Sequence, residues 1–183
     1  MNKKELIIGG AQFGYNYGSP KYNKKIKKND LNKILKIANK KKIVKIDTAR
    51  LYKDSEKNIG KFLSENKKIN FQIFSKLDFI KAIKRKNKRE ITYQIFQNIY
   101  ETLKFLNLNK LEGVAVHNVS DFFKKKKIFL ECFDILKKEK IIKGFGVSIY
   151  TPQELYRSLC IKNVSYIQMP ISILDNRWNI KKI

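Results

Sequence analysis

The sequence predicts an α/β fold built on a parallel sheet, and three observations support this prediction. Short apolar runs rich in β-branched and aromatic residues recur along the 183 residues, as buried strands do. Segments whose apolar residues follow helical spacing separate these runs. Strands that alternate with helices need crossover connections, which place the strands parallel in one sheet.

Six runs have the length and composition of buried strands. They are residues 6–8, 43–46, 71–74, 114–116, 145–147 and 164–167. Two segments between them show the clearest helical spacing, with apolar residues on one face. These residues are Leu31, Ile34, Leu35 and Ala38 in the first, and Ile95, Ile99, Leu103 and Leu106 in the second.

Helix starts are also marked in the sequence. Thr151 precedes Pro152, with Glu154 three positions after the threonine, which is the pattern of a capping box. Ser120 opens a further helical segment, and the four lysines at 124–127 inside it are interpreted as a solvated face. Residues 81–89 are polar and basic, and we expect them to form a loop after the third strand.

The net charge of +25 invites a nucleic-acid-binding hypothesis, but the composition weakens it. The 41 basic residues are 36 Lys and only 5 Arg, and Arg is the residue that bidentate phosphate and base recognition favours. Lys, Ile and Asn together make 79 of the 183 residues, and all three have A/T-rich codons. Nucleotide bias therefore explains the charge, and we expect no nucleic-acid partner.

Other classes of protein are disfavoured by simple features. No run approaches the roughly 18 apolar residues of a membrane span, and the first residues do not continue into a signal peptide. Cys132 and Cys160 are the only cysteines, which disfavours a disulfide framework or a zinc site. We therefore expect a cytoplasmic protein with no membrane partner and no bound metal.

Polar residues stand at the ends of five of the predicted strands. They are Asp47, Lys76, His117, Ser148 and Gln168. The carboxyl ends of parallel strands share one face, where sites of α/β folds are built. Polar residues often end strands only because the loops that follow are exposed to solvent. Five of them together, including the single histidine, nevertheless favour one shared site.

Motifs along the whole chain give this sequence a family resemblance. The segment at 47–60, with its Asp-Thr-Ala triplet, Tyr52 and Ser-Glu pair, resembles the signature of the aldo-keto reductases. Five further segments are similar to the family's strands, in the same order: 6–14, 75–77, 114–118, 144–148 and 167–170. The resemblance implies a (β/α)8 barrel of the TIM type and an NADPH-dependent enzyme that reduces an aldehyde or ketone, a small-molecule carbonyl substrate, to an alcohol.

The resemblance places the family's four catalytic residues at Asp47, Tyr52, Lys76 and His117. Reduction adds hydride to carbon, so a proton must reach the oxygen, and Tyr52 would donate it. A free phenol has a pKa near 10, and Lys76 beside it would lower that pKa. Asp47 would hold the lysine, and a neutral His117 would orient the carbonyl.

The cofactor-binding residues are also implied by the resemblance. Ser148 and Gln168 would hold the carboxamide of NADPH, with Asp47 close by, while Gly10, Ala11 and Gln12 would lie near the nicotinamide ribose. The chain departs from the family at three positions. Gly10 stands where many members have Thr, Lys53 where Gly usually follows the tyrosine, and Ile149 where many have Asn.

Length is the anomaly of this sequence. A complete barrel needs about 250 residues, and the chain shows six strands, so we expect about six of eight βα units. Residues 1–183 would then form one domain, the N-terminal two-thirds of a reductase. In the family, strands seven and eight hold the phosphates and the adenosine. An inactive, truncated remnant of such an enzyme is the alternative, and a basic nucleic-acid-binding protein is a third hypothesis. The sequence gives no oligomeric state.

Overall fold

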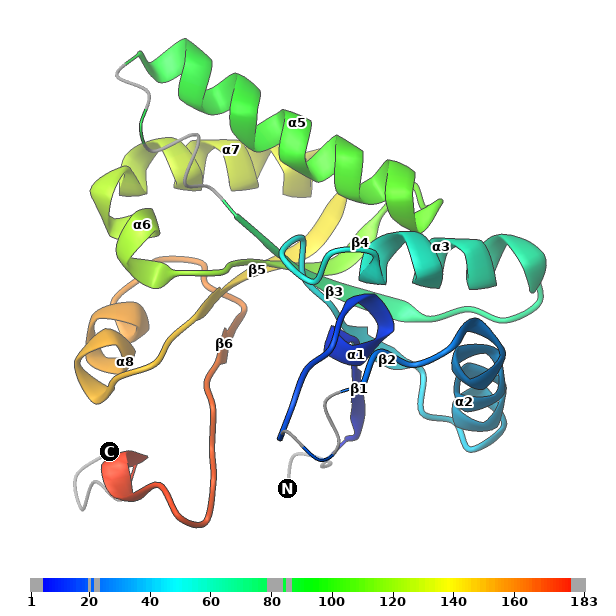
Figure 1. Ribbon diagram of the computed structural model, residues 1–183. Coiled ribbons are helices and arrows are strands. Elements are labelled where there is room, and N and C mark those ends of the chain that lie inside the picture. The colour runs from blue at the N-terminus through cyan, green and yellow to red at the C-terminus, as the bar shows by residue number, and fades with distance from the viewer. Residues whose placement is uncertain (1–4, 20, 22–23, 79–83, 85–86, 179–183) are drawn as a thin grey trace.

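The computed structural model of the protein describes residues 5–19, 21, 24–78, 84 and 87–178 (Figure 1). Six strands form one sheet in the order β1-β2-β3-β4-β5-β6, and every neighbouring pair is parallel. The strands are β1 (Ile7–Gly9), β2 (Lys45–Asp47), β3 (Gln72–Leu77), β4 (Leu111–Val116), β5 (Ile142–Ser148) and β6 (Tyr166–Gln168). Each strand therefore pairs only with the strands next to it in the sequence.

Helices connect the strands and lie on the outer side of the curled sheet (Figure 1). The α-helices are α1 (Ala11–Gly14), α2 (Lys28–Lys40), α3 (Ser55–Glu65), α5 (Lys88–Leu106), α6 (Val119–Lys124), α7 (Lys126–Lys138) and α8 (Pro152–Leu159). A 3₁₀ turn, η1 (Asn176–Trp178), follows β6. The architecture is an incomplete (β/α)8 barrel with six of its eight strands, which confirms the predicted fold class.

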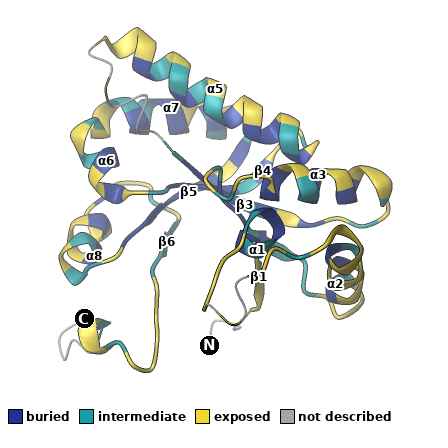
Figure 2. Ribbon diagram, in the orientation of Figure 1, coloured by how far each residue is buried: buried dark blue, intermediate teal, exposed yellow. Residues whose placement is uncertain are grey.

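The core lies between the outer face of the sheet and these helices (Figure 2). Helix α5 buries Ile95 and Ile99 completely, in agreement with its predicted apolar face. Phe133 of α7 stacks on Phe145 of β5 with ring centroids 4.9 Å apart. The alternation of β5 explains this packing, since Phe145 and Val147 point to the helices while Gly146, between them, faces the barrel interior.

Two helix boundaries differ from the sequence prediction. The segment expected to start at Ser120 is two helices, because the backbone leaves helical geometry at Lys125, with φ −137°. Asn118 caps the first of them by accepting a hydrogen bond from the backbone N–H of Ser120 (2.9 Å). The predicted loop at 81–89 is also too long, since α5 begins at Lys88, and residues 81–83 and 85–86 lie outside the described part. The capping box at Thr151 is confirmed.

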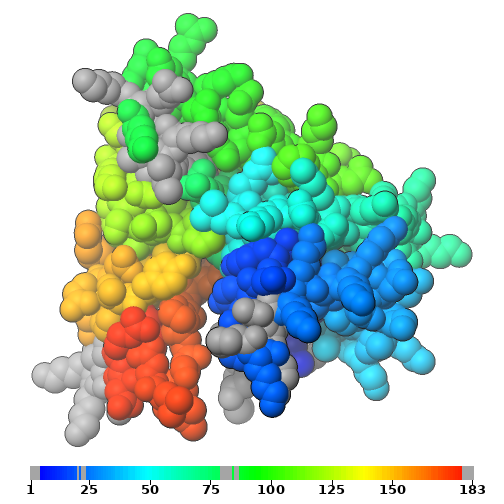
Figure 3. Space-filling model, in the orientation of Figure 1, coloured from blue at the N-terminus to red at the C-terminus, as the bar shows by residue number. Residues whose placement is uncertain are grey.

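The sheet has two edge strands, β1 and β6, in the part of the chain that the structure describes. Large apolar side chains are exposed at and beyond these edges. Ile7 in β1 is 50% exposed, and Ile173 and Leu174 after β6 are 98% and 89% exposed. Figure 3 shows the segment after β6, in red, on the same face of the molecule as the N-terminal segment, in blue. An open parallel edge is a pairing surface, and within the described residues β1 and β6 each present one.

Among the described helices, none is both long and apolar enough to cross a membrane.

Candidate active site

The five polar residues predicted at strand ends lie at one end of the sheet. Asp47, Ser148 and Gln168 are the last residues of β2, β5 and β6, and His117 directly follows β4. Lys76 lies inside β3, one residue before its end, so that strand is longer than predicted. The parallel register places Ser148 beside Gln168. The common rim expected from the sequence is therefore present.

Lys76 and Asp47 form an ion pair at this rim. The Lys76 ammonium donates to both carboxylate oxygens of Asp47, at 2.6 Å and 2.5 Å, and to the carbonyl oxygen of Thr48 at 3.2 Å. Lys76 is only 3% exposed. The amide of Gln168 donates to the same carboxylate at 3.2 Å. A buried ammonium needs such partners, because an uncompensated buried charge is strongly destabilising.

Tyr52 lies on the turn that follows β2, above the ion pair. Its carbonyl accepts from the backbone N–H of Ser55 at 3.0 Å, which closes the turn at the start of α3. The Lys76 ammonium stands 5.2 Å from the centroid of the Tyr52 ring. His117 meets the same ring edge-on, with centroids 6.2 Å apart. Asp47, Tyr52, Lys76 and His117 thus form one cluster.

The acidity of Tyr52 differs from the sequence expectation. Its pKa is raised well above its ordinary value, first because burial disfavours the phenolate and second because the Asp47 carboxylate repels it. The ammonium of Lys76 is held by Asp47 and faces the ring of Tyr52. Among the described residues, no hydrogen bond joins it to the phenol oxygen. The expectation that the pKa falls is wrong for the protein in this state, because burial and the Asp47 carboxylate set an upward net shift.

Burial also shifts the two nitrogen bases of the cluster. The pKa of Lys76 is lowered by desolvation, against which the Asp47 carboxylate acts. The pKa of His117 is lowered by desolvation and then by the Lys76 charge, with Asp78 and Asp47 opposing. Both effects favour the neutral form of the imidazole. Within the described part of the chain, its buried Nδ1 atom has no hydrogen-bond partner.

A cavity of about 230 Å³ opens beside His117. It is lined by Leu51, Leu77, Asp78, Val116, His117, Asn118, Asp121 and Tyr150. Most of these residues come from the ends of β3 and β4 or from the loops that follow the strands. The cavity has room for a small organic molecule next to the imidazole.

Of the remaining predicted cofactor residues, Gly10 lies directly against Asp47. The backbone N–H of Gly10 donates to the Asp47 carbonyl at 2.7 Å, and a Cβ added at Gly10 would stand 2.9 Å from the same oxygen. The tight approach of β1 to β2 thus accounts for glycine at position 10. Ala11 is buried in α1, and the Gln12 amide donates to the Tyr17 carbonyl at 2.8 Å. Ser148 is 5% exposed beside Gln168.

The structure also shows the setting of the other two departures from the family pattern. Lys53 has φ 49°, in the left-handed region that glycine adopts without strain, so glycine is the residue that fits the turn after the tyrosine. Ile149 is fully buried, and its backbone N–H donates to the Gln168 carbonyl at 2.9 Å. An apolar side chain at 149 therefore packs into the core.

Sequence reasoning missed two supports of the cluster. Gly14 packs against the Tyr52 turn so closely that a Cβ would lie 1.6 Å from the Tyr52 carbonyl oxygen. Glu56, only 2% exposed, accepts hydrogen bonds from Ser75 and Arg50. The signal for Glu56 was its place in the Ser-Glu pair of the 47–60 segment. No local sequence pattern predicts the contact of Gly14, because it joins α1 to the Tyr52 turn, which is distant in the sequence.

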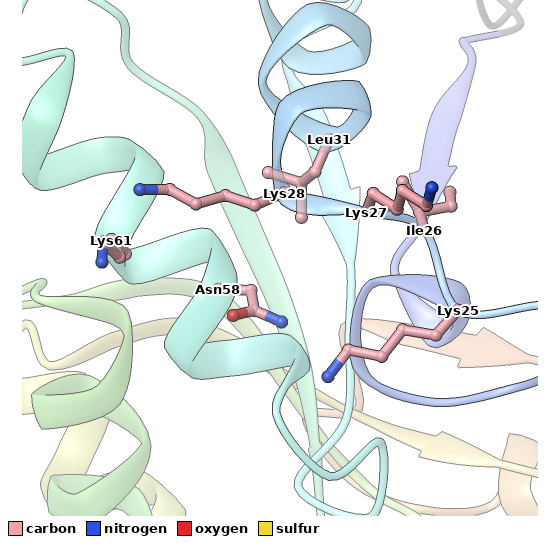
Figure 4. Close-up of a pocket in the computed structure, with 7 residues that line it drawn as sticks. All are labelled: Lys25, Ile26, Lys27, Lys28, Leu31, Asn58 and Lys61. Atoms are coloured by element: carbon pink, nitrogen blue, oxygen red, sulfur yellow. The ribbon is translucent and has the colours of Figure 1, made fainter.

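A second hollow, of about 350 Å³, lies away from the cluster, between α3 and the start of α2 (Figure 4). Its lining is basic: Lys25, Ile26, Lys27, Lys28, Leu31, Asn58 and Lys61. Lys25 pairs with Asp54 at 2.9 Å and Lys28 with Glu65 at 3.2 Å. Acidic neighbours therefore partly neutralise this pocket.

The sequence model of the Aldo/keto reductase family matches residues 5–182. The chain belongs to the aldo-keto reductase family. Comparison with curated protein sequences gave no match.

Solved aldo-keto reductases share the fold. A Pseudomonas aeruginosa protein assigned to the aldo-keto reductases is 21% identical, with a TM-score of 0.73, over 93% of this chain and 64% of its own. The holo form of a Bacillus halodurans aldo-keto reductase is 22% identical, with a TM-score of 0.69, over 94% of this chain and 55% of its own. A Klebsiella pneumoniae aldo-keto reductase in complex with NADPH is 17% identical, with a TM-score of 0.60, over 88% and 52%.

The chain thus spans between about half and two-thirds of the length of these aldo-keto reductases.

Proposed function

We propose that this chain carries the catalytic cluster of an NADPH-dependent oxidoreductase that reduces an aldehyde or ketone to an alcohol. Membership of the aldo-keto reductase family supports an oxidoreductase. The observation on which the proposal rests most is the buried Lys76–Asp47 pair beneath Tyr52, with His117 at the edge of the same ring.

In this proposal Tyr52 is the proton donor. A phenol whose ordinary pKa is about 10 is protonated at neutral pH, so a proton is available when negative charge develops on the carbonyl oxygen. Lys76 stabilises the phenolate that is left behind, for which its ammonium has to turn from the ring face toward the oxygen. Asp47 keeps that ammonium charged and in place, since its carboxylate opposes the effect of burial on the lysine pKa.

His117 orients the substrate in the proposed reaction. A neutral imidazole carries one N–H, which can donate to a carbonyl oxygen and support the charge that develops there. The cavity beside His117 provides a place for the rest of a small carbonyl compound.

The residues of the rim fit the nicotinamide end of NADPH. Ser148 and Gln168 stand side by side with groups that can bond to a carboxamide. Gly10 lies against the Asp47 carbonyl, and we propose that the nicotinamide ribose binds near Gly10 and the two residues that follow it, Ala11 and Gln12. When bound, NADPH supplies the hydride.

We also propose that much of the affinity for NADPH comes from outside this chain. Phosphate sites of this barrel type commonly lie after strands seven and eight, and the chain spans only 52–64% of the compared reductases. The chain alone is then expected to bind NADPH weakly. A catalytically inactive remnant remains the alternative function.

A NADPH titration and a reduction assay separate these possibilities. We expect weak binding by fluorescence and slow consumption of NADPH with a panel of small aldehydes and ketones. Tyr52→Phe should remove most of this activity, while Tyr100→Phe, a control on the outer face of α5, should keep it. Binding without any reduction would support the remnant, and full activity in Tyr52→Phe would refute the proton-donor role.

We further propose a cytoplasmic location and no nucleic-acid partner. Cys132 and Cys160 are free thiols, as is usual in a reducing compartment. Binding to DNA or RNA that weakens steeply with salt would contradict the second proposal.

A further inference from the structure

A buried carboxylate lies behind the catalytic cluster. Glu56, in the first turn of α3, is 2% exposed. One of its oxygens accepts from the Ser75 hydroxyl at 2.7 Å. The other accepts from the Arg50 guanidinium at 3.1 Å and from the Thr102 hydroxyl at 3.3 Å. Glu56 thus joins the loop after β2, strand β3 and helix α5.

The partners of Glu56 lie next to the residues of the cluster. Ser75 directly precedes Lys76, and Arg50 is two positions before Tyr52. The backbone N–H of Arg50 donates to the Lys76 carbonyl at 2.8 Å, and that of Lys76 donates to the Thr48 carbonyl at 3.1 Å. The loop that carries Tyr52 is therefore attached to β3 at Lys76 itself.

Arg50 has a second carboxylate partner, which differs in its surroundings. Glu101 on α5 also contacts the guanidinium, but its side chain is 54% exposed, against 2% for Glu56. The guanidinium stacks over the Phe105 ring at 4.3 Å. An exposed ion pair contributes little, whereas a buried one holds its geometry because neither group can turn to water.

We propose that Glu56 is a positioning residue of the catalytic cluster, which fixes the Tyr52 loop through Arg50 and the Lys76 strand through Ser75. This inference rests on the proposed function. Among the hydrogen bonds of the described residues, none joins Glu56 to the Tyr52 or Lys76 side chain, so it acts through its partners. Its carboxylate accepts three hydrogen bonds from three donors.

Glu56→Gln is the informative substitution, because glutamine has the same shape but only one accepting oxygen. At least one of the donors on Ser75, Arg50 and Thr102 then loses its partner. Glu101→Gln is the matched control, since it removes only the exposed partner of the same arginine. The single histidine of the chain gives the readout, because the NMR titration of His117 is assigned without ambiguity.

His117 senses the place of Lys76, whose charge helps to lower the pKa of the imidazole. If Glu56 positions the cluster, Glu56→Gln should move the His117 pKa upward, toward its ordinary value, by about half a unit or more. Glu101→Gln should titrate as the wild type does. Loss of stability alone would not move this titration, since it is measured on the folded protein.

Reduction kinetics give a second readout. Misplacement of reacting groups by about 1 Å costs on the order of 100-fold in rate, so kcat should fall in Glu56→Gln by roughly 10- to 100-fold while KM for the carbonyl compound changes little. An inactive wild type would refute the proposed function and leave the titration to decide the role of Glu56.

An unchanged His117 titration in folded Glu56→Gln would overturn the inference. If that variant does not fold, Ser75→Ala replaces it, with Thr102→Val as its control. Ser75→Ala removes only the bond beside Lys76 and should shift the titration in the same direction. A Ser75→Ala titration equal to that of Thr102→Val would overturn the inference as well.

Discussion

The contact between Gly14 and the Tyr52 turn leads to a sharp prediction about stability. A Cβ at Gly14 would lie 1.6 Å from the Tyr52 carbonyl oxygen and 2.7 Å from the Ser55 nitrogen. Real Cβ atoms do not approach closer than 3.0 Å, so α1 and the turn must separate by about 1.4 Å in Gly14→Ala. Both contacts are with backbone, so no side-chain rotation relieves them.

The cost follows from what this separation breaks. It opens the two bonds that join the α1 segment to α3, from the Asn58 amide to the Phe13 carbonyl (2.7 Å) and from the Ser55 hydroxyl to the Gly10 carbonyl (2.8 Å). Overpacking costs about 1–3 kcal/mol, and each lost hydrogen bond about 1 kcal/mol. We expect Gly14→Ala to lower the free energy of unfolding by about 4 kcal/mol, which corresponds to a fall in Tm of roughly 10 °C.

Gly9→Ala is the matched control, since a Cβ at Gly9 meets nothing within 4 Å. Alanine in an open strand position should leave stability within about 1 kcal/mol of the wild type. Urea unfolding followed by circular dichroism measures both variants. A Gly14→Ala protein as stable as Gly9→Ala would refute the assignment of Gly14 as the backbone contact that supports Tyr52.

Three further predictions concern the turn and the cluster. Lys53→Gly should raise the free energy of unfolding by about 1 kcal/mol, because a φ of 49° strains any residue other than glycine. Lys61→Gly, inside α3, is the control and should lower the free energy of unfolding by about as much. Equal losses in urea unfolding would contradict backbone strain at Lys53. Asp47→Asn should lower the free energy of unfolding by about 3–5 kcal/mol, because it leaves the buried Lys76 charge without its partner. The double variant Asp47→Leu/Lys76→Met removes both charges and should lose less stability than Asp47→Asn. Additive losses in the same assay would show that the two residues are not coupled. The pKa of His117 is lowered in the folded protein, so just below pH 6.5 the unfolded chain binds more protons and stability falls as the pH drops. The difference between the unfolding free energies at pH 7.5 and pH 5 should therefore be smaller in His117→Gln than in the wild type. An equal difference in the two proteins would contradict the lowered pKa.

The sheet and the rim could be predicted because both depend on local patterns. Each strand is a short apolar run, and a parallel order then places Asp47, Ser148 and Gln168 at one end. The break at Lys125 was not predictable, since apolar residues continue on both sides of it and the lysines there carry no turn signal. The start of α5 at Lys88 was hidden by the basic composition shared with the preceding residues.

The electrostatics of the cluster could be predicted only in part. The pairing of Lys76 with Asp47 follows from complementary charge. The direction of the Tyr52 pKa does not, because it depends first on how deeply the fold buries the phenol and then on how close the Asp47 carboxylate lies. The network of Glu56 depends on three elements that meet in space, and spacing along the sequence does not encode such a meeting.

The sequential pairing of the strands has a consequence for how this protein is made. Every strand adds to the one synthesised just before it, so the sheet can grow during translation without waiting for distant segments. The Lys76–Asp47 pair joins residues 29 positions apart and can form early, whereas the bond from Gln168 to Asp47 spans 121 positions. During synthesis, the Asp47 carboxylate can therefore bind the Lys76 ammonium before it binds the Gln168 amide.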